Sequence, residues 1–169
     1  MNIVMKKLFI VLYDSANTGK TTSLNATRRL IESLAIPQGA PYTYELLWGH
    51  HDADFRCRFT INDKIIGVSS AGDDANAVKD GLDTLESNQK SCDIIILATR
   101  SKGYSTAMVD DFRAQLPQDS DIVWLTKEHL ADIVGVWTDE TRHSITDLMA
   151  QHTAESIVEI IRLLRPGII

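Results

Sequence analysis

The residues best suited to chemistry lie together near the N-terminus, in the run Asp14-Ser15-Ala16-Asn17-Thr18-Gly19-Lys20-Thr21-Thr22. They follow a short apolar run and precede a segment of helical periodicity. A loop folded back over a helix start directs backbone N–H groups inward, and the helix dipole adds partial positive charge. The Lys20 ammonium would neutralise a terminal phosphate, and the Thr21 hydroxyl would ligate a bridging Mg²⁺ ion. The pattern therefore predicts a polyphosphate-binding loop.

This strand–loop–helix context resembles the P-loop NTPase superfamily, most clearly from Leu8 to Leu34 and only in topology elsewhere. The resemblance implies that residues 14–22 bind ATP or GTP with Mg²⁺. Family loops read G-x-x-x-x-G-K-[ST], and Asp14 stands where the first glycine is expected. A carboxylate there would tighten the turn by bonding a backbone N–H. Its negative charge would also oppose the polyphosphate or engage Lys20, so we expect weakened binding.

The elements that must position this loop follow from the alternation of short apolar runs with helical periodicity. Asn62 and Asp63 tolerate the positive φ angles of a tight turn, so the two runs around them predict an antiparallel hairpin. We expect strands at 7–13, 42–48, 55–61, 64–70, 93–99 and 121–126, and helices over 20–35, 75–85, 108–116, 130–137 and 144–164.

Strands alternating with helices predict one α/β domain over residues 1–169. We expect three layers around a mostly parallel sheet, with the P-loop after the first strand. A capping pattern, Ser144-x-x-Asp147, favours a last helix that begins near Ser144. Because ligands bind at the carboxyl ends of parallel strands, the loops after Tyr13, Ser70, Thr99 and Thr126 should share one rim.

Further charged residues on this rim are candidates for the rest of the machinery. Superfamily members usually place a second acidic residue at the end of a neighbouring strand, near the magnesium ion. Asp73 is the candidate here, both for the metal and for catalysis, and the cap of the following helix is the alternative. Arg100 would stabilise charge on a transferring phosphoryl group. Arg142 would act from a lid, and for both arginines a solvated surface position is the alternative.

Two segments resemble the small-GTPase arrangement more loosely. Ser69-Ser70-Ala71-Gly72 follows the hairpin where those proteins carry Asp-x-x-Gly, and Ser69 replaces the aspartate. Thr126-Lys127-Glu128-His129 stands where they carry Asn-Lys-x-Asp to read guanine. His129 replaces the last carboxylate, which removes the pair of bonds that would select guanine. Guanine specificity is therefore not expected.

The segment Trp48-Gly49-His50-His51-Asp52-Ala53-Asp54 also gathers imidazoles and carboxylates. Two His and two Asp residues suit a metal ion by type. Adjacent His residues point in different directions in a strand, however, and loops are naturally rich in Asp and Gly. A metal site, a substrate-facing or switch loop and a plain connecting loop all remain interpretations of this segment.

Composition limits the remaining classes of function. The net charge of −6 argues against general nucleic-acid binding, which needs clustered Lys and Arg. Cys57 and Cys92 are the only cysteines and have no metal-like spacing, so neither a disulfide framework nor a zinc site is expected. A reducing cytoplasm is therefore the expected location. The apolar run after Lys7 is too short for a membrane span, and no targeting segment is visible.

Three hypotheses follow. The first is a P-loop phosphotransferase or NTPase that uses Mg²⁺ and ATP, with a small-molecule or protein acceptor. The second is a GTPase-like switch, and the third is a nucleotide-binding module without catalysis. Nucleotide turnover separates the first two from the third, and competition between ATP and GTP separates the first from the second.

Overall fold

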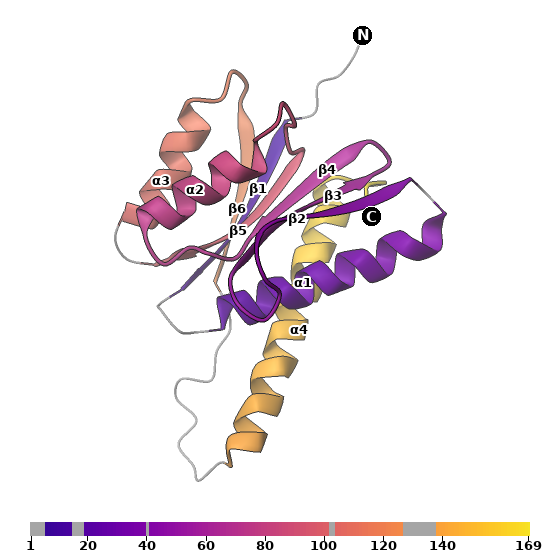
Figure 1. Cartoon of the computed structure of the whole chain (residues 1–169), viewed down its shortest axis with the longest axis vertical. Helices are drawn as coiled ribbons and strands as arrows, with labels where there is room; N and C mark the ends of the chain where they lie inside the picture. Colours follow the sequence, from indigo (N-terminus) through magenta and orange to yellow (C-terminus); the bar gives the residue numbers. More distant parts are fainter. Residues whose placement is uncertain (1–5, 15–18, 40, 102–103, 127–137) are drawn as a thin grey trace.

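The computed structural model describes residues 6–14, 19–39, 41–101, 104–126 and 138–169. In chain order its elements are β1 (Lys7–Asp14), α1 (Lys20–Ala35), a 3₁₀ turn (Ile36–Gln38), β2 (Tyr42–Gly49), β3 (Phe55–Ile61), β4 (Lys64–Ser69), α2 (Ala75–Leu85), β5 (Ile94–Arg100), α3 (Tyr104–Ala114), β6 (Ser120–Thr126) and α4 (Asp139–Leu164) (Figure 1).

The six strands form one sheet in the order β2-β3-β4-β5-β1-β6. Strands β4, β5, β1 and β6 run parallel to one another, and β3 runs antiparallel to both of its neighbours. The predicted α/β class and mostly parallel sheet are therefore confirmed. The predicted hairpin is also present as β3 and β4, with φ angles of 50° at Asn62 and 62° at Asp63 in its turn.

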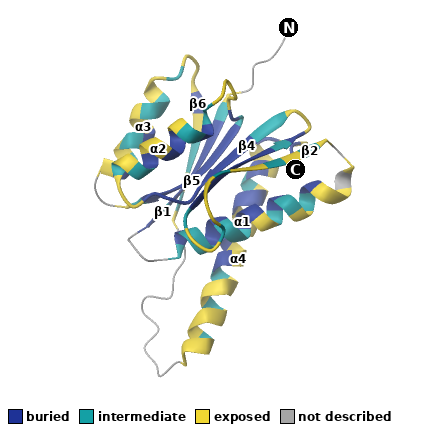
Figure 2. Cartoon of the chain, viewed as in Figure 1, coloured by how far each residue is buried: buried dark blue, intermediate teal, exposed yellow. Residues whose placement is uncertain are grey.

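The core is built from strands whose apolar runs are buried on both sides. In β1, five consecutive residues from Leu8 to Leu12 are fully buried, and β5 is buried from Ile94 to Ala98. Such continuous runs are typical of parallel strands covered on both faces. Figure 2 shows these buried strands at the centre of the molecule.

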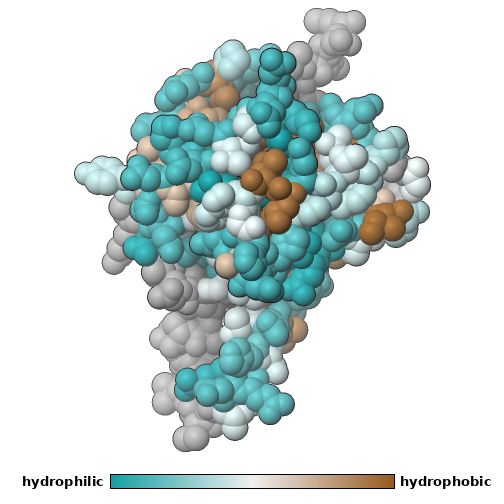
Figure 3. Space-filling model, viewed as in Figure 1, coloured by the Kyte–Doolittle hydropathy of each residue, from teal (hydrophilic) through white to brown (hydrophobic). Residues whose placement is uncertain are grey.

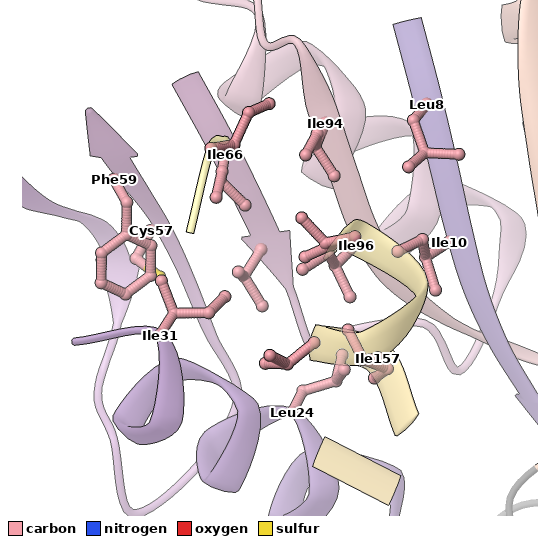
Figure 4. Packing of buried hydrophobic residues seen from close by; sticks show 14 of the residues in the cluster. Leu8, Ile10, Leu24, Ile31, Cys57, Phe59, Ile66, Ile94, Ile96 and Ile157 are labelled. Atoms are coloured by element: carbon pink, nitrogen blue, oxygen red, sulfur yellow. The ribbon is translucent and has the colours of Figure 1, made fainter. Parts of the chain in front are cut away.

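Side chains alternate along β1 between two clusters on opposite faces of the sheet. Leu8 and Ile10 belong to the larger cluster, together with residues of α1 and α4 such as Leu24 and Ile157 (Figure 4). Phe9 and Val11 belong to the other cluster, with residues of α2 and α3. The same alternation fixes the register of β1, because a shift by one residue would exchange the two faces.

The start of α4 differs from the expectation. The helix begins at Asp139, five residues before the predicted Ser144, and Thr138 caps it by accepting a hydrogen bond from the Thr141 N–H over 3.2 Å. The pattern Ser144-x-x-Asp147 therefore lies within the helix. The predicted helix at 130–137 lies outside the described residues.

The described surface is mainly hydrophilic, with separate apolar spots, on the face that Figure 3 shows. α4 has 26 residues, but charged side chains recur along it. No described helix combines the length and the apolar character that crossing a bilayer requires.

Candidate functional site

The segment predicted to be a phosphate loop lies in the chain between β1 and α1. β1 ends at Asp14 and α1 begins at Lys20, directly after Gly19. Gly19 has φ 77° and ψ 28°, a left-handed conformation that residues with a Cβ rarely adopt. Ser15, Ala16, Asn17 and Thr18 lie outside the described residues.

The N-terminus of α1 suits an anion. Gly19 offers no side-chain cap, and the first turn contains no acidic residue. The first N–H groups of a helix lack intrahelical acceptors, and the helix dipole places partial positive charge beside them. In a 16-residue helix without a side-chain cap, an anion would satisfy these groups.

Lys20 is buried at this point, with 6% of its surface exposed. Its Nζ donates to the backbone oxygen of Asp14 over 3.4 Å. Burial lowers the pKa of Lys20, while the carboxylates of Asp73, Asp14 and Asp54 act in the opposite direction. Lys20 is thus a buried cation whose charged form is disfavoured by burial and by Arg100 and favoured by three carboxylates.

Asp54 was a candidate only as part of the 48–54 segment, and sequence reasoning did not connect it with Thr21. Its Oδ1 accepts a hydrogen bond of 2.6 Å from the Thr21 hydroxyl, on the first turn of α1. The sequence-based expectation placed the second acidic residue at the carboxyl end of a strand. Asp54 instead precedes β3, and because β3 is antiparallel to β4, its start lies at the rim where β4 ends. The predicted hairpin contained the signal for this position.

Local backbone geometry holds Asp54 in place. The Asp54 carbonyl accepts from the His50 N–H over 3.2 Å, across a tight turn between β2 and β3. Gly49 precedes this turn with φ 75°, and a Cβ there would lie 2.0 Å from the Asp54 carbonyl oxygen. Only glycine allows so close an approach.

Ser70, the residue directly after β4, contacts the same carboxylate. Its hydroxyl donates to Asp54 Oδ1 over 3.2 Å and accepts from the Phe55 N–H over 2.9 Å. Ser70 is 3% exposed. Thr21, Asp54 and Ser70, from three separate segments, thus form one hydrogen-bonded group.

Asp73 and Arg100 also reach the rim, but their contacts differ from those of Asp54. Asp73 Oδ1 lies 3.6 Å from Arg100 Nε, in a partly exposed ion pair. The alternative reading of Asp73 as a helix cap is wrong, since Asp74 caps α2 by accepting from the Ala77 N–H over 2.9 Å. Arg100 has this partner, but 43% of its side chain is exposed, so a solvated surface position remains its alternative interpretation. Arg100 pairs with Asp14 in the ladder between β1 and β5.

The segment around His50 and His51 packs against α1. Asn25 of α1 donates to the His51 backbone oxygen over 2.8 Å, and His51 Nε2 lies 2.6 Å from the Tyr44 hydroxyl. Burial lowers the pKa of His51, and the positive charge of Arg28 acts in the same direction. A hollow of about 190 Å³ lies between this segment and α1, lined by Thr21, Thr22, Asn25, His51 and Asp52.

A metal site built by this segment alone receives no support. Within the described ranges, no group of three or more His, Cys, Asp or Glu side chains is arranged to hold a metal ion. The segment instead supplies Asp54 to the rim and closes one side of the α1 N-terminus. These contacts fit both the substrate-facing loop and the plain connecting loop.

The remaining candidates contribute less. Thr22 lines the hollow, and Arg142 is exposed in the first turn of α4. Lys127, Glu128 and His129 lie outside the described residues. Comparison with protein-family models, curated proteins and solved structures gives no significant match.

Proposed function

We propose that this chain binds a Mg²⁺–nucleoside triphosphate at the rim and acts as a phosphotransferase or NTP hydrolase, with ATP preferred. The observation that carries the proposal is the Thr21–Asp54 hydrogen bond of 2.6 Å beside the buried Lys20. A hydroxyl, a carboxylate and an ammonium group at an uncapped helix start are the parts that hold a metal–phosphate group. In this proposal the fold is a three-layer P-loop domain.

Lys20 and the start of α1 would bind the phosphates. The lysine already lies among Asp14, Asp54 and Asp73, whose charges favour its ammonium form. Phosphate oxygens would accept charge-assisted hydrogen bonds from the Lys20 ammonium. The Gly19, Lys20 and Thr21 N–H groups would supply further donors along the helix dipole.

Thr21 and Asp54 fit a magnesium ion by their chemistry. Mg²⁺ prefers oxygen ligands, keeps several waters and is usually held by one or two carboxylates together with substrate phosphates. A site with few protein ligands agrees with the lack of a larger acidic or imidazole group in the described part. When bound, the ion would neutralise charge on the phosphates. Asp73 is the metal ligand expected from the sequence. Because it pairs with Arg100, it would act on the ion indirectly and not as a direct ligand.

Arg100 is the residue proposed to act on the transferring phosphoryl group. It neighbours Asp14 in the sheet, and its charge lowers the pKa of Lys20, which locates both cations in one electrostatic group. If Arg100 were released from Asp73, its guanidinium would stabilise the negative charge that develops on the phosphoryl group during transfer.

A binding module without catalysis is the second candidate. The Arg100–Asp73 ion pair favours it, because a guanidinium engaged by a carboxylate is not available to phosphate. Measurement of phosphate release or transfer separates the two candidates, since only the first turns nucleotide over.

Calorimetric titration with ATP and GTP, each with Mg²⁺ and with a chelator, tests the proposal. Lys20→Ala should weaken triphosphate binding by about 10- to 100-fold, as expected for loss of a charge-assisted contact. Lys79→Ala is the matched control, because Lys79 lies exposed on α2 and pairs only with Asp83 in the described part. Equal affinities of the wild type and Lys20→Ala would refute the proposal.

A further inference from the structure

Ser70 connects two segments at the rim through a single buried hydroxyl. Its Oγ contacts Asp54 Oδ1 at 3.2 Å, the Phe55 nitrogen at 2.9 Å and the Phe55 oxygen at 3.4 Å. Its own N–H donates to the Phe55 oxygen over 3.0 Å. The side chain therefore lies against the point where the chain passes from Asp54 into β3.

The hydrogen-bonding capacity of a serine hydroxyl decides how these contacts are used. The group has one hydrogen to donate and two lone pairs that accept. The Phe55 N–H occupies a lone pair, so the hydrogen is left for an acceptor. The Asp54 carboxylate is the stronger acceptor, because charge-assisted hydrogen bonds are stronger than neutral ones. The Phe55 carbonyl, the other acceptor, already accepts from the Ser70 N–H.

Asp54 Oδ1 thus receives two hydroxyl hydrogens, one from Thr21 and one from Ser70. Asp54 Oδ2 has no hydrogen-bond donor within the residues that the structure describes. Two donors on one oxygen fix the rotation of the carboxylate and leave the other oxygen for a ligand. Outer partners of this kind orient the groups that bind metal ions.

We propose that Ser70 is a positioning residue that orients the Asp54 carboxylate toward Mg²⁺. The inference rests on the proposed function, since it assigns a role to the neighbour of the metal-binding oxygen. In this proposal Ser70 would bind neither the nucleotide nor the metal directly. It acts through Asp54.

Ser69 provides a matched control. It is the preceding residue and is equally buried, at 2% exposure. Its side chain points to α2, where a Cβ added to Gly81 would lie 2.5 Å from its Oγ. Within the described residues its Oγ has no hydrogen-bond partner, so Ser69→Ala removes a buried hydroxyl without altering the rim.

The experiment compares Ser70→Ala, Ser70→Thr, Ser69→Ala and Asp54→Asn with the wild type. ATP and GTP are titrated with a chelator and across a range of Mg²⁺ concentrations, and Mn²⁺ binding is followed by electron paramagnetic resonance. Ser70→Ala should lower the affinity for Mg²⁺ by about 10-fold or more. Its affinity for metal-free nucleotide should stay within about twofold of the wild type, because Lys20 and the α1 N-terminus are unchanged. Ser70→Thr, which keeps a hydroxyl, should restore metal affinity, and Ser69→Ala should match the wild type.

The outcomes separate the inference from the function on which it rests. Loss of Mg²⁺ dependence in Asp54→Asn, with full dependence in Ser70→Ala, overturns the role of Ser70 and leaves the proposed function standing. Equal losses in Ser70→Ala and Ser69→Ala also overturn it, since they indicate a general effect of core serines. Unchanged Mg²⁺ dependence in Asp54→Asn refutes the proposed metal site itself.

Discussion

The Thr21 hydroxyl donates to Asp54 Oδ1 over 2.6 Å, although the two residues are 33 positions apart in the chain. Thr21 is the second residue of α1, and Asp54 directly precedes the antiparallel strand β3. Their contact joins the two sides of the rim. Asp54 thereby places a carboxylate beside Thr21, whereas the parallel strands β4 and β5 end in Ser69 and Arg100.

Asp54→Asn should abolish the gain in nucleotide affinity that Mg²⁺ provides. The amide keeps the size of the side chain but loses the charge that attracts a divalent ion. Metal-free binding should be unchanged or slightly tighter, because a negative charge near the phosphates is removed. Asp63→Asn is the control, since Asp63 is exposed in the turn between β3 and β4. Calorimetry over a Mg²⁺ series measures both variants, and a full magnesium response in Asp54→Asn would contradict the assignment.

Asp73→Ala and Asp74→Ala should separate a functional carboxylate from a structural one. Asp74 caps α2, so its loss should reduce the free energy of unfolding by about 0.5–2 kcal/mol. Asp73→Ala should leave thermal stability nearly unchanged and lower Mg²⁺-dependent turnover more than nucleotide affinity, because Asp73 faces Arg100 and Lys20. Thermal melts and turnover assays test the pair. A stability loss in Asp73→Ala without an effect on turnover would show that Asp73 only supports the fold.

Asp14→Asn should tighten triphosphate binding by about five- to tenfold at low salt. Asp14 is buried, and its charge favours the ammonium form of Lys20. Removing this charge lowers the repulsion toward phosphate oxygens. The gain should decrease as ionic strength rises. Binding isotherms at two salt concentrations measure it, and weaker binding by Asp14→Asn would show instead that the carboxylate organises the loop.

Lys20→Met should weaken nucleotide binding by about 10- to 100-fold while leaving the protein as stable at neutral pH as the wild type, or more stable. Burial lowers the pKa of Lys20 from 10.5, so the folded state disfavours the charged form. This cost is fully present below the lowered pKa and disappears as pH rises toward 10.5. The stability advantage of Lys20→Met should therefore shrink at alkaline pH. Denaturant unfolding over a pH series measures it, and a variant much less stable at neutral pH would contradict this prediction.

Much of the fold could be predicted from the sequence, because its signals are local. The apolar run from Leu8 to Leu12 marks β1, and the turn residues Asn62 and Asp63 mark the hairpin. The predicted start of α4 was wrong, because the sequence contains a capping-box pattern at Ser144 whereas the residue that caps the helix is Thr138. In a helix of 26 residues, the position of the cap has little influence on the periodicity that identifies the helix.

The site was predicted only in part, because its contacts are long-range. Lys20 and Thr21 follow from one continuous motif, whereas Asp54 depends on the direction of β3 in the sheet. The position of Asp54 also depends on the strand order, in which β5 lies between β1 and β4. The search among carboxyl ends of parallel strands gave Asp73, while the start of an antiparallel strand supplies the acid that contacts Thr21.

Paramagnetic broadening of backbone amide signals by Mn²⁺–ATP tests the central claim most directly. Mn²⁺ replaces Mg²⁺ among oxygen ligands and broadens the signals of nuclei close to it. We predict strong broadening at Gly19, Thr21, Asp54 and Ser70, and none at Ser144 on the exposed part of α4. Lys20→Ala should remove the broadening at concentrations where the wild type is saturated. Broadening centred elsewhere, or an unchanged pattern in Lys20→Ala, would contradict a metal–nucleotide site at this rim.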